Sequence, residues 1–264
     1  MAVKGRKMAL RIGISIGVLL FIVLSAGLFY LYKRGSEISK MTPLNSQEVI
    51  SGVYAIKDNT YIDFYVVKSG DSFIAIDSGE NQNKVEGELR KLNLDPLKVE
   101  AVFLTHTDSD HVGGLGLFSN ARVYISIDEE QMINGKTARA LIFKNNLPVR
   151  YSLLADNQNV EVSDTKVHCL LTPGHTPGSM SYVVNDIYLF SGDTLSLKNG
   201  EVDVFNEFFN MDTNEQKSSI TKISKLPNVR YIFTAHYGYS DNYQASFARW
   251  NGTYILAIKN VQIC

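Results

Sequence analysis

Thr105-His106-Thr107-Asp108-Ser109-Asp110-His111 is the segment that decides the fold of this chain, and it directly follows the apolar run Val99–Leu104. A short apolar run, rich in β-branched residues, that ends at a polar turn is typical of a buried strand passing into a loop. The first histidine and the two aspartates are spaced two residues apart, so an extended backbone points all three to one side. Taken alone, the segment also fits a solvated polar turn.

Three later apolar runs end on the same residue types, after a turn that contains glycine or threonine. His175 follows the run Lys166–Leu171, Asp193 follows Asp186–Phe190, and His236 follows Val229–Phe233. Rigid strands that present His and Asp on the loops at their ends are a common way to assemble a metal site. Imidazole and carboxylate are usual ligands of zinc and similar metals. Because four of the five histidines lie at these ends, a metal site is favoured over solvated turns.

Composition limits the remaining possibilities. The chain has 264 residues, of which 45% are hydrophobic, so it can bury a sizeable core. Its net charge is -1, with acids and bases interspersed, so no nucleic-acid partner is expected. The two cysteines, Cys169 and Cys264, form no framework and no zinc-binding pair by spacing. Cys169 lies in an apolar run and is predicted to be a buried, inert thiol, while a disulfide between the two stays open.

The N-terminus predicts a membrane anchor. Residues 12–32 contain no charged side chain, and as a helix they span about 30 Å, the thickness of a bilayer core. Basic residues are slightly more numerous before this run than after it, so residues 1–11 are predicted to be a cytoplasmic tail. Residues 33–48 would be a linker, and residues 49–264 a catalytic domain outside the cytoplasm, in a single-pass protein of the cell membrane. The alternative is a cleaved signal peptide, although the run is long for one.

Strand clusters interleave with helices in the rest of the chain, which predicts an α/β (α+β) sandwich with packed sheets inside and helices outside. Residues 147–163 suggest an edge strand and a loop, and Trp250 and Tyr254–Ile258 suggest a final helix or strand. The further predicted strands are Gly52–Ile56, Tyr61–Val67, Ser72–Ile76, Arg122–Ile127 and Met180–Val184, and the predicted helices are Asn83–Leu92, Asp128–Ile133 and Asn214–Leu226.

The motifs together resemble the metallo-β-lactamase fold superfamily. They are the His-x-x-x-Asp-His pattern of residues 106–111, Pro173–Gly178, Ser191–Thr194, the late His236, and Ile76–Gly79 as a first motif. The resemblance covers roughly residues 50–240 and implies a four-layer αββα sandwich with a site for two divalent metal ions. In that scheme, Asp77 supports the metal loop without binding metal. The first ion takes His106, Asp108 and His175, the second takes Asp110, His111 and His236, and Asp193 bridges them.

Asp108 departs from the pattern of this superfamily, which usually has histidine there. Asp108 either binds metal as a carboxylate, or only hydrogen-bonds a ligand and leaves a mononuclear enzyme, or marks a degenerate site. Two dications, three aspartates and a bridging hydroxide sum to a charge of zero, whereas histidine at 108 would give +1. The carboxylate is therefore expected to weaken the Lewis acidity of the metals and to favour iron or manganese somewhat. Zinc remains the first expectation in an oxidising location.

The resemblance implies a metal-dependent hydrolase in which a metal-bound hydroxide cleaves an ester, thioester, lactone or amide of a small-molecule substrate. Asp110 would orient the nucleophile and move its proton. Two alternatives stay open: a phosphodiesterase or nuclease similar to competence-type members, which also carry Asp at 108, and a non-catalytic ligand-binding domain. His168 is predicted to pack within its strand, and Gly113–Gly116 to form a bend. The oligomeric state is not indicated by the sequence.

Overall fold

In a computed structural model, the chain is described from residue 2 to residue 139 and from residue 143 to residue 252, with side chains from residue 14 onward. Tyr254–Ile258 and Cys264, for which the sequence left alternatives open, lie outside the described residues. The chain divides into two compact units, Met1–Lys40 and Met41–Cys264.

The first unit is the helix α1 (Ala2–Ile38). From Ile14 to Tyr32 its apolar side chains are exposed on every side, with Phe21 70% and Tyr32 74% accessible. A helix that is apolar all round needs an apolar surrounding. By length and composition alone, Ile14–Ile38 is sufficient to cross a membrane, with a mean hydropathy of 2.5. The helix continues through Ile38, so the start of the predicted linker is helical.

The second unit contains a seven-stranded mixed sheet in the order β1-β2-β3-β4-β5-β6-β7. Strands β1 to β4 form an antiparallel meander, and β4 to β7 run parallel. Because the strands beside β5 run parallel to it, its carboxyl end lies on the same side of the sheet as theirs. The segment 105–111 begins on that side. The strands are β1 (Gln47–Ile50), β2 (Val53–Lys57), β3 (Asp63–Ser69), β4 (Ser72–Ile76), β5 (Val99–Phe103), β6 (Arg122–Ser126) and β7 (Tyr151–Leu154).

A second sheet of six strands has the order β15-β14-β11-β10-β9-β8, and a separate hairpin pairs β12 with β13. Within it, β11 and β14 are parallel, so their carboxyl ends, which carry Asp193 and His236, point the same way. The strands are β8 (Asn159–Val162), β9 (Thr165–Leu171), β10 (Met180–Val184), β11 (Tyr188–Phe190), β12 (Leu195–Lys198), β13 (Glu201–Val204), β14 (Tyr231–Phe233) and β15 (Tyr239–Ser240).

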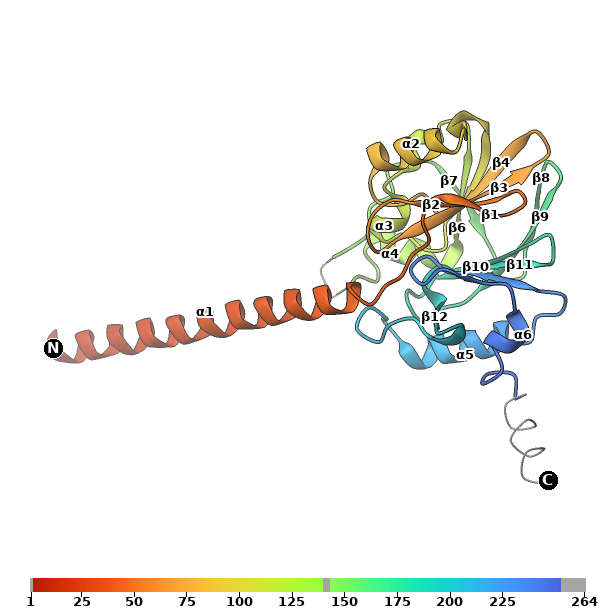
Figure 1. Cartoon of the computed structure of the whole chain (residues 1–264). Helices are drawn as coiled ribbons and strands as arrows, with labels where there is room; N and C mark the ends of the chain where they lie inside the picture. The colour runs from red at the N-terminus through yellow and green to blue at the C-terminus, as the bar shows by residue number, and fades with distance from the viewer. Residues whose placement is uncertain (1, 140–142, 253–264) are drawn as a thin grey trace, which may run out of the picture. The chain divides into compact units, whose positions relative to one another are not determined.

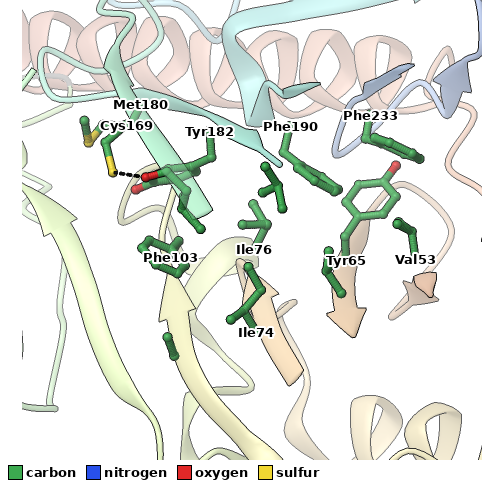
Figure 2. Close-up of a cluster of buried hydrophobic side chains, with 14 of the residues drawn as sticks. Val53, Tyr65, Ile74, Ile76, Phe103, Cys169, Met180, Tyr182, Phe190 and Phe233 are labelled. Carbon is green, nitrogen blue, oxygen red and sulfur yellow. Dashed lines mark hydrogen bonds between the residues drawn. The ribbon is translucent and has the colours of Figure 1, made fainter. Parts of the chain in front are cut away.

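The hydrophobic core lies between the two sheets (Figure 2). Phe190 of β11 stacks on Phe233 of β14 with ring centroids 4.8 Å apart, and Tyr65 of β3 meets Phe233 at 5.1 Å from the opposite sheet. Hydrogen bonds also join the sheets near the first motif: the Tyr182 hydroxyl donates to the Leu104 carbonyl at 2.6 Å. The core therefore fixes the ends of strands from both sheets relative to one another.

Helices cover the outer faces of both sheets (Figure 1). Val85 and Leu89 of α2 pack into a second core on the outer side of the first sheet, while Ile220 and Ile223 of α5 are buried beneath the second sheet. The helices of this unit are α2 (Gln82–Lys91), α3 (Ser109–Val112), α4 (Glu130–Asn134), α5 (Thr213–Ile223) and α6 (Tyr243–Ser246). Mixed α/β sheets with helices outside confirm the predicted class.

Several element boundaries differ from the sequence prediction. Residues 147–163 hold two strands, β7 and β8, rather than one strand and a loop. The last predicted helix ends at Ile223, short of Leu226, because Pro227 follows and the chain must turn. Trp250 belongs to neither a helix nor a strand, and its indole donates to the Val202 carbonyl at 2.9 Å.

Candidate metal centre

The loop after β5 is held by Asp77, at the end of β4. Its carboxylate accepts hydrogen bonds from the Thr105 amide at 2.7 Å and the Thr105 hydroxyl at 2.8 Å, and it contacts His111 Nδ1 at 2.9 Å. Asp77 has a φ of +66°, a conformation that costs energy for a residue with a side chain. This backbone turns the carboxylate toward the loop, so Asp77 lies where the resemblance placed it, supporting the segment without facing the centre.

The glycines after the loop allow close backbone packing. A Cβ at Gly113 would lie 1.9 Å from the Glu80 carbonyl oxygen, and a Cβ at Gly114 would lie 2.1 Å from that of Ser78. The Gly113 amide donates to the Gly79 carbonyl at 2.7 Å. These residues therefore dock α3 against the Asp77 turn, which agrees with the predicted bend.

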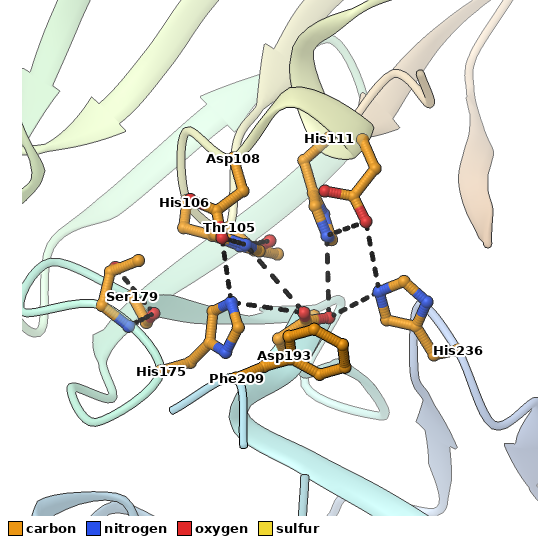
Figure 3. Close-up of polar contacts among 12 residues, drawn as sticks. Thr105, His106, Asp108, His111, His175, Ser179, Asp193, Phe209 and His236 are labelled. Carbon is orange, nitrogen blue, oxygen red and sulfur yellow. Dashed lines mark hydrogen bonds and ion pairs between the residues drawn. The ribbon is translucent and has the colours of Figure 1, made fainter. Parts of the chain in front are cut away.

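The two sheets bring the predicted donor residues together (Figure 3). Asp193 follows β11 in a short turn, and Gly192 before it has a φ of +50° and packs against Thr105. His175 lies in the loop between β9 and β10, and His236 follows β14. We call His106, Asp108 and His175 the first donor group, and Asp110, His111 and His236 the second donor group; within each, the donor atoms lie within 4.8 Å of one another.

Distances within the first donor group suit a small cation. Asp108 Oδ2 lies 3.5 Å from His106 Nε2 and 3.2 Å from His175 Nε2. Asp193 Oδ2 completes the group, 3.4 Å from His175 Nε2 and 4.0 Å from His106 Nε2. Ligands about 2.0–2.1 Å from a tetrahedral zinc ion are separated by about 3.3–3.4 Å. The four donor atoms therefore fit a zinc-sized ion.

The second donor group has the same arrangement around the other oxygen of Asp193. Asp110 Oδ2 lies 3.9 Å from His111 Nε2 and 3.7 Å from His236 Nε2. Asp193 Oδ1 lies 3.6 Å from His111 Nε2 and 3.2 Å from His236 Nε2. Asp193 thus faces both groups, one oxygen to each, as a bridging carboxylate requires.

Three of the four histidines are oriented by a contact at Nδ1 that leaves Nε2 facing the centre. His106 Nδ1 lies 3.1 Å from the Thr105 hydroxyl, His111 Nδ1 contacts Asp77, and His236 Nδ1 contacts the Tyr61 carbonyl. Such outer contacts fix the ring tautomer and raise the basicity of a metal-binding histidine. The Nε2 atoms of these three rings are buried and have no hydrogen-bond partner in the described part of the chain.

Burial and mutual charge shift the pKa values in the centre. Burial alone raises the pKa of Asp193, but His236, His111 and His175 outweigh it and hold that pKa well below its usual range. Burial lowers the pKa of His111, but the charges of Asp77, Asp193 and Asp110 raise it to about 10. Burial, aided by the Arg139 charge, lowers the pKa of His175 to about 4. The surrounding imidazoles thus keep the Asp193 carboxylate ionised.

Arg139, which the sequence analysis missed, contacts the unusual Asp108. Its Nη2 lies 2.6 Å from Asp108 Oδ2, and its Nε lies 3.3 Å from Oδ1. The Asn145 amide nitrogen also donates to Asp108 Oδ1 at 2.9 Å. The carboxylate is therefore held through both oxygens, and Oδ2 lies close to both Arg139 and His175. The positive charge of Arg139 also offsets the extra negative charge that the sequence assigned to the site.

Glu129 is a second residue that the sequence did not single out. It is buried, and its carboxylate accepts from the Thr107 amide at 2.9 Å, the Thr107 hydroxyl at 2.7 Å and the Thr176 hydroxyl at 2.6 Å. It therefore ties the loop that carries His106 to the loop that carries His175. Burial raises the pKa of Glu129, against these hydrogen bonds.

Aromatic rings border the histidines. Phe205 lies 5.2 Å from the His175 ring and 5.3 Å from the His236 ring, and Tyr61 stacks on His236 at 6.1 Å. Asp108 and Asp110, with 19% and 22% of their side chains accessible, are more open than Asp193 at 4%. Access to the centre is therefore from the side of Asp108 and Asp110. His168 is partly exposed on β9 and joins neither donor group, as the sequence predicted.

Comparison with known proteins agrees with this geometry. The metallo-beta-lactamase superfamily model matches residues 58–236, so the chain belongs to the metallo-beta-lactamase superfamily. A metallo-beta-lactamase family protein of Thermus thermophilus superposes with a TM-score of 0.62 at 18% identity, over 80% of this chain and 82% of that one.

Two of the curated relatives are named as hydrolases. A probable polyketide biosynthesis zinc-dependent hydrolase of Bacillus subtilis (strain 168) is 34% identical over 127 residues, 47% of this chain and 50% of the relative. A hydroxyacylglutathione hydrolase of Buchnera aphidicola subsp. Baizongia pistaciae is 32% identical over 172 residues, 62% of this chain and 57% of the relative. The chain thus spans only half to three-fifths of the length of these two relatives.

Proposed function

We propose that this chain is a membrane-anchored, metal-dependent hydrolase that cleaves an ester, thioester, lactone or amide bond of a small molecule. The observation that carries the proposal is the meeting of seven His and Asp side chains from four separate strand ends, arranged as two groups that share Asp193. The proposed metal-binding residues are His106, Asp108, Asp110, His111, His175, Asp193 and His236.

The donor set supports zinc as the metal. Four imidazoles and three carboxylates are borderline and hard ligands, and the separations of 3.2–4.0 Å suit a tetrahedral ion. Bound dications would supply Lewis acidity and would make a bound water more acidic. Because Arg139 offsets the charge of Asp108, the Lewis acidity of the site should be close to that of a site with histidine at 108, rather than weaker.

Asp110 is the proposed catalytic residue. Its Oδ2 faces His111 and His236, and its side chain is the more open of the two acids on the accessible side of the centre. A carboxylate in this position can accept a hydrogen bond from an attacking water, orient it and later transfer its proton to the leaving group. Asp193 is enclosed by four imidazoles and is proposed to hold the metals rather than to move protons.

The surroundings favour an uncharged acyl group over a nucleic acid. Phe205 and Tyr61 provide apolar walls beside the histidines, and such walls exclude water from the bond being cleaved. Phosphodiester binding instead relies on several free cations. The relatives named as a hydroxyacylglutathione hydrolase and as a probable polyketide biosynthesis zinc-dependent hydrolase support the same choice.

Helix α1 supports the proposed single-pass anchor at residues 12–32, with the domain 49–264 outside the cytoplasm. The described apolar side chains of that run are exposed and uncharged, and the bilayer core is the surrounding that stabilises them. Protease added to intact cells should then degrade the domain and spare the tail 1–11. Protection of the domain until the cells are lysed would contradict this orientation.

The hydrolase proposal is tested with the full chain in detergent, on a panel of acyl thioesters, lactones, amides and phosphodiesters. Hydrolysis of at least one acyl substrate should disappear after chelation, return with zinc, and fall in Asp110→Asn but not in Arg90→Gln, an exposed control on α2. Turnover of phosphodiesters alone would favour the nuclease alternative. Full zinc occupancy without turnover on the panel would favour a non-catalytic ligand-binding domain.

A further inference from the structure

The guanidinium of Arg139 is fully committed to protein partners. Besides the two contacts with Asp108, its Nη1 donates to the Phe209 carbonyl at 2.6 Å. All three nitrogen atoms of the group are therefore in use, and the side chain is half-buried. A guanidinium held at all three nitrogen atoms is fixed in place.

The same guanidinium faces the donor atoms of the first donor group. Nη2 lies 2.6 Å from Asp108 Oδ2 and 2.9 Å from His175 Nε2. The second donor group has no such neighbour among the described residues. There, His111 Nε2, His236 Nε2 and Asp193 Oδ1 are buried, and their ion-pair contacts are with one another and with Asp110. The two groups have similar donors and similar spacing, but only the first faces a side chain whose positive charge cannot be lost by releasing a proton.

We propose that Arg139 makes the two metal positions unequal, so that the second donor group binds its ion tightly and first, and the first donor group binds an ion more weakly. The inference rests on the proposed metal site and goes beyond it, because it assigns the order of filling to one residue. Arg139 acts as a positioning residue that sets the charge at Asp108, not as a catalytic residue.

Two physical effects act in the same direction. A guanidinium keeps its charge at any pH at which the protein is folded, so it cannot relieve the repulsion by losing a proton. A dication at the first donor group would lie close to that charge in a buried setting, where Coulomb repulsion is strong. In addition, His175 Nε2 has one lone pair, so the contact with Nη2 must be given up before that nitrogen binds a metal.

Stepwise zinc titration of the metal-stripped full chain in detergent, in competition with a coloured chelator, tests the proposal. The wild type should bind two equivalents, the second about ten-fold or more weaker than the first. Arg139→Gln, which removes the charge, should tighten the second step about ten-fold toward the first. Arg139→Lys keeps the charge and should keep the steps unequal, and the matched control Arg90→Gln should change neither. His175→Asn should remove the weak step, and His236→Asn the tight one.

Three outcomes would overturn the inference: two equal steps in the wild type, no change in Arg139→Gln, or a weaker second step in Arg139→Gln. The last result would mean that Arg139 only holds Asp108 in position. These outcomes leave the hydrolase proposal intact. A wild-type chain that binds no zinc would instead reject the proposed function along with the inference.

Discussion

Asp77→Asn changes a residue that does not face the metal centre, yet it should disable the second donor group. The wild-type carboxylate accepts from the Thr105 amide at 2.7 Å and the Thr105 hydroxyl at 2.8 Å, and contacts His111 Nδ1 at 2.9 Å. Asparagine keeps one acceptor, for the amide, but places an NH₂ group where the second oxygen was. That NH₂ group cannot accept a hydrogen bond from His111 Nδ1.

The consequence is a change of tautomer. In the neutral form of the ring, the form that binds metal, a donor beside His111 Nδ1 makes that atom an acceptor, so the ring proton lies on Nε2, the atom that faces Asp110 and Asp193. A protonated Nε2 cannot bind metal. Losing an outer partner of a metal-binding histidine costs about 10–100-fold in metal affinity, which equals about 1.4–2.8 kcal/mol.

The assay is zinc competition on the full chain in detergent, read alongside thermal melting with and without zinc. The zinc dissociation constant of the tighter binding step should rise by about 10–100-fold. Asp58→Asn is the matched control, since Asp58 is also buried and also accepts from backbone amides, including that of Asn81 at 2.7 Å, but contacts no donor histidine. Wild-type zinc affinity in Asp77→Asn, or an equal loss in Asp58→Asn, would refute the tautomer reasoning.

Three further changes follow from the same structure. Burial raises the pKa of Asp63 well above its usual value. The folded chain therefore keeps a proton that the unfolded chain loses above about pH 4. The free energy of unfolding falls as the pH rises from there to the raised pKa of the folded state. Asp63→Asn should therefore raise Tm at pH 7 and flatten its pH dependence; a lower Tm at every pH would contradict this. A Cβ at Gly192 would lie 2.5–2.8 Å from the Thr105 side chain, so Gly192→Ala should displace Asp193 and lower activity about 100-fold at unchanged fold, as judged by circular dichroism. Phe233→Ala should lower the free energy of unfolding, measured with denaturant, by about 3–5 kcal/mol, because the ring is fully buried between Phe190 and Tyr65. A loss below about 1 kcal/mol would contradict this and show that the core relaxes to fill the cavity.

The donor residues were predictable because strand ends are readable from sequence. Each of the four apolar runs became a strand, and parallel pairing of β11 with β14 placed Asp193 and His236 side by side. No property of the sequence near residue 108 gives the contact with Arg139, which is 31 positions away and arises only from tertiary packing. A signal existed in Asp108 itself, since a carboxylate replacing a buried histidine requires a counter-charge.

Other omissions have local causes. The hairpin of β12 and β13 was missed although Asn199-Gly200 lies between its strands, a pair that favours tight hairpin turns. Both residues have positive φ, at +54° and +80°, as such turns require. Strand β1 lies at a sheet edge and has two polar, exposed residues followed by two apolar, half-buried ones, so it has no alternation of apolar and polar residues to read. Its pairing with β2 depends on the fold rather than on its own sequence.

The central claim is that His and Asp residues from both sheets hold metal ions through a shared Asp193. Anomalous scattering from crystals of the zinc-loaded full chain, recorded on both sides of the zinc absorption edge, measures this directly. The account predicts a strong zinc peak bounded by Asp110, His111, His236 and Asp193, with a weaker one beside His106 and His175. Zinc found only elsewhere on the protein, with no peak among these side chains, would contradict it.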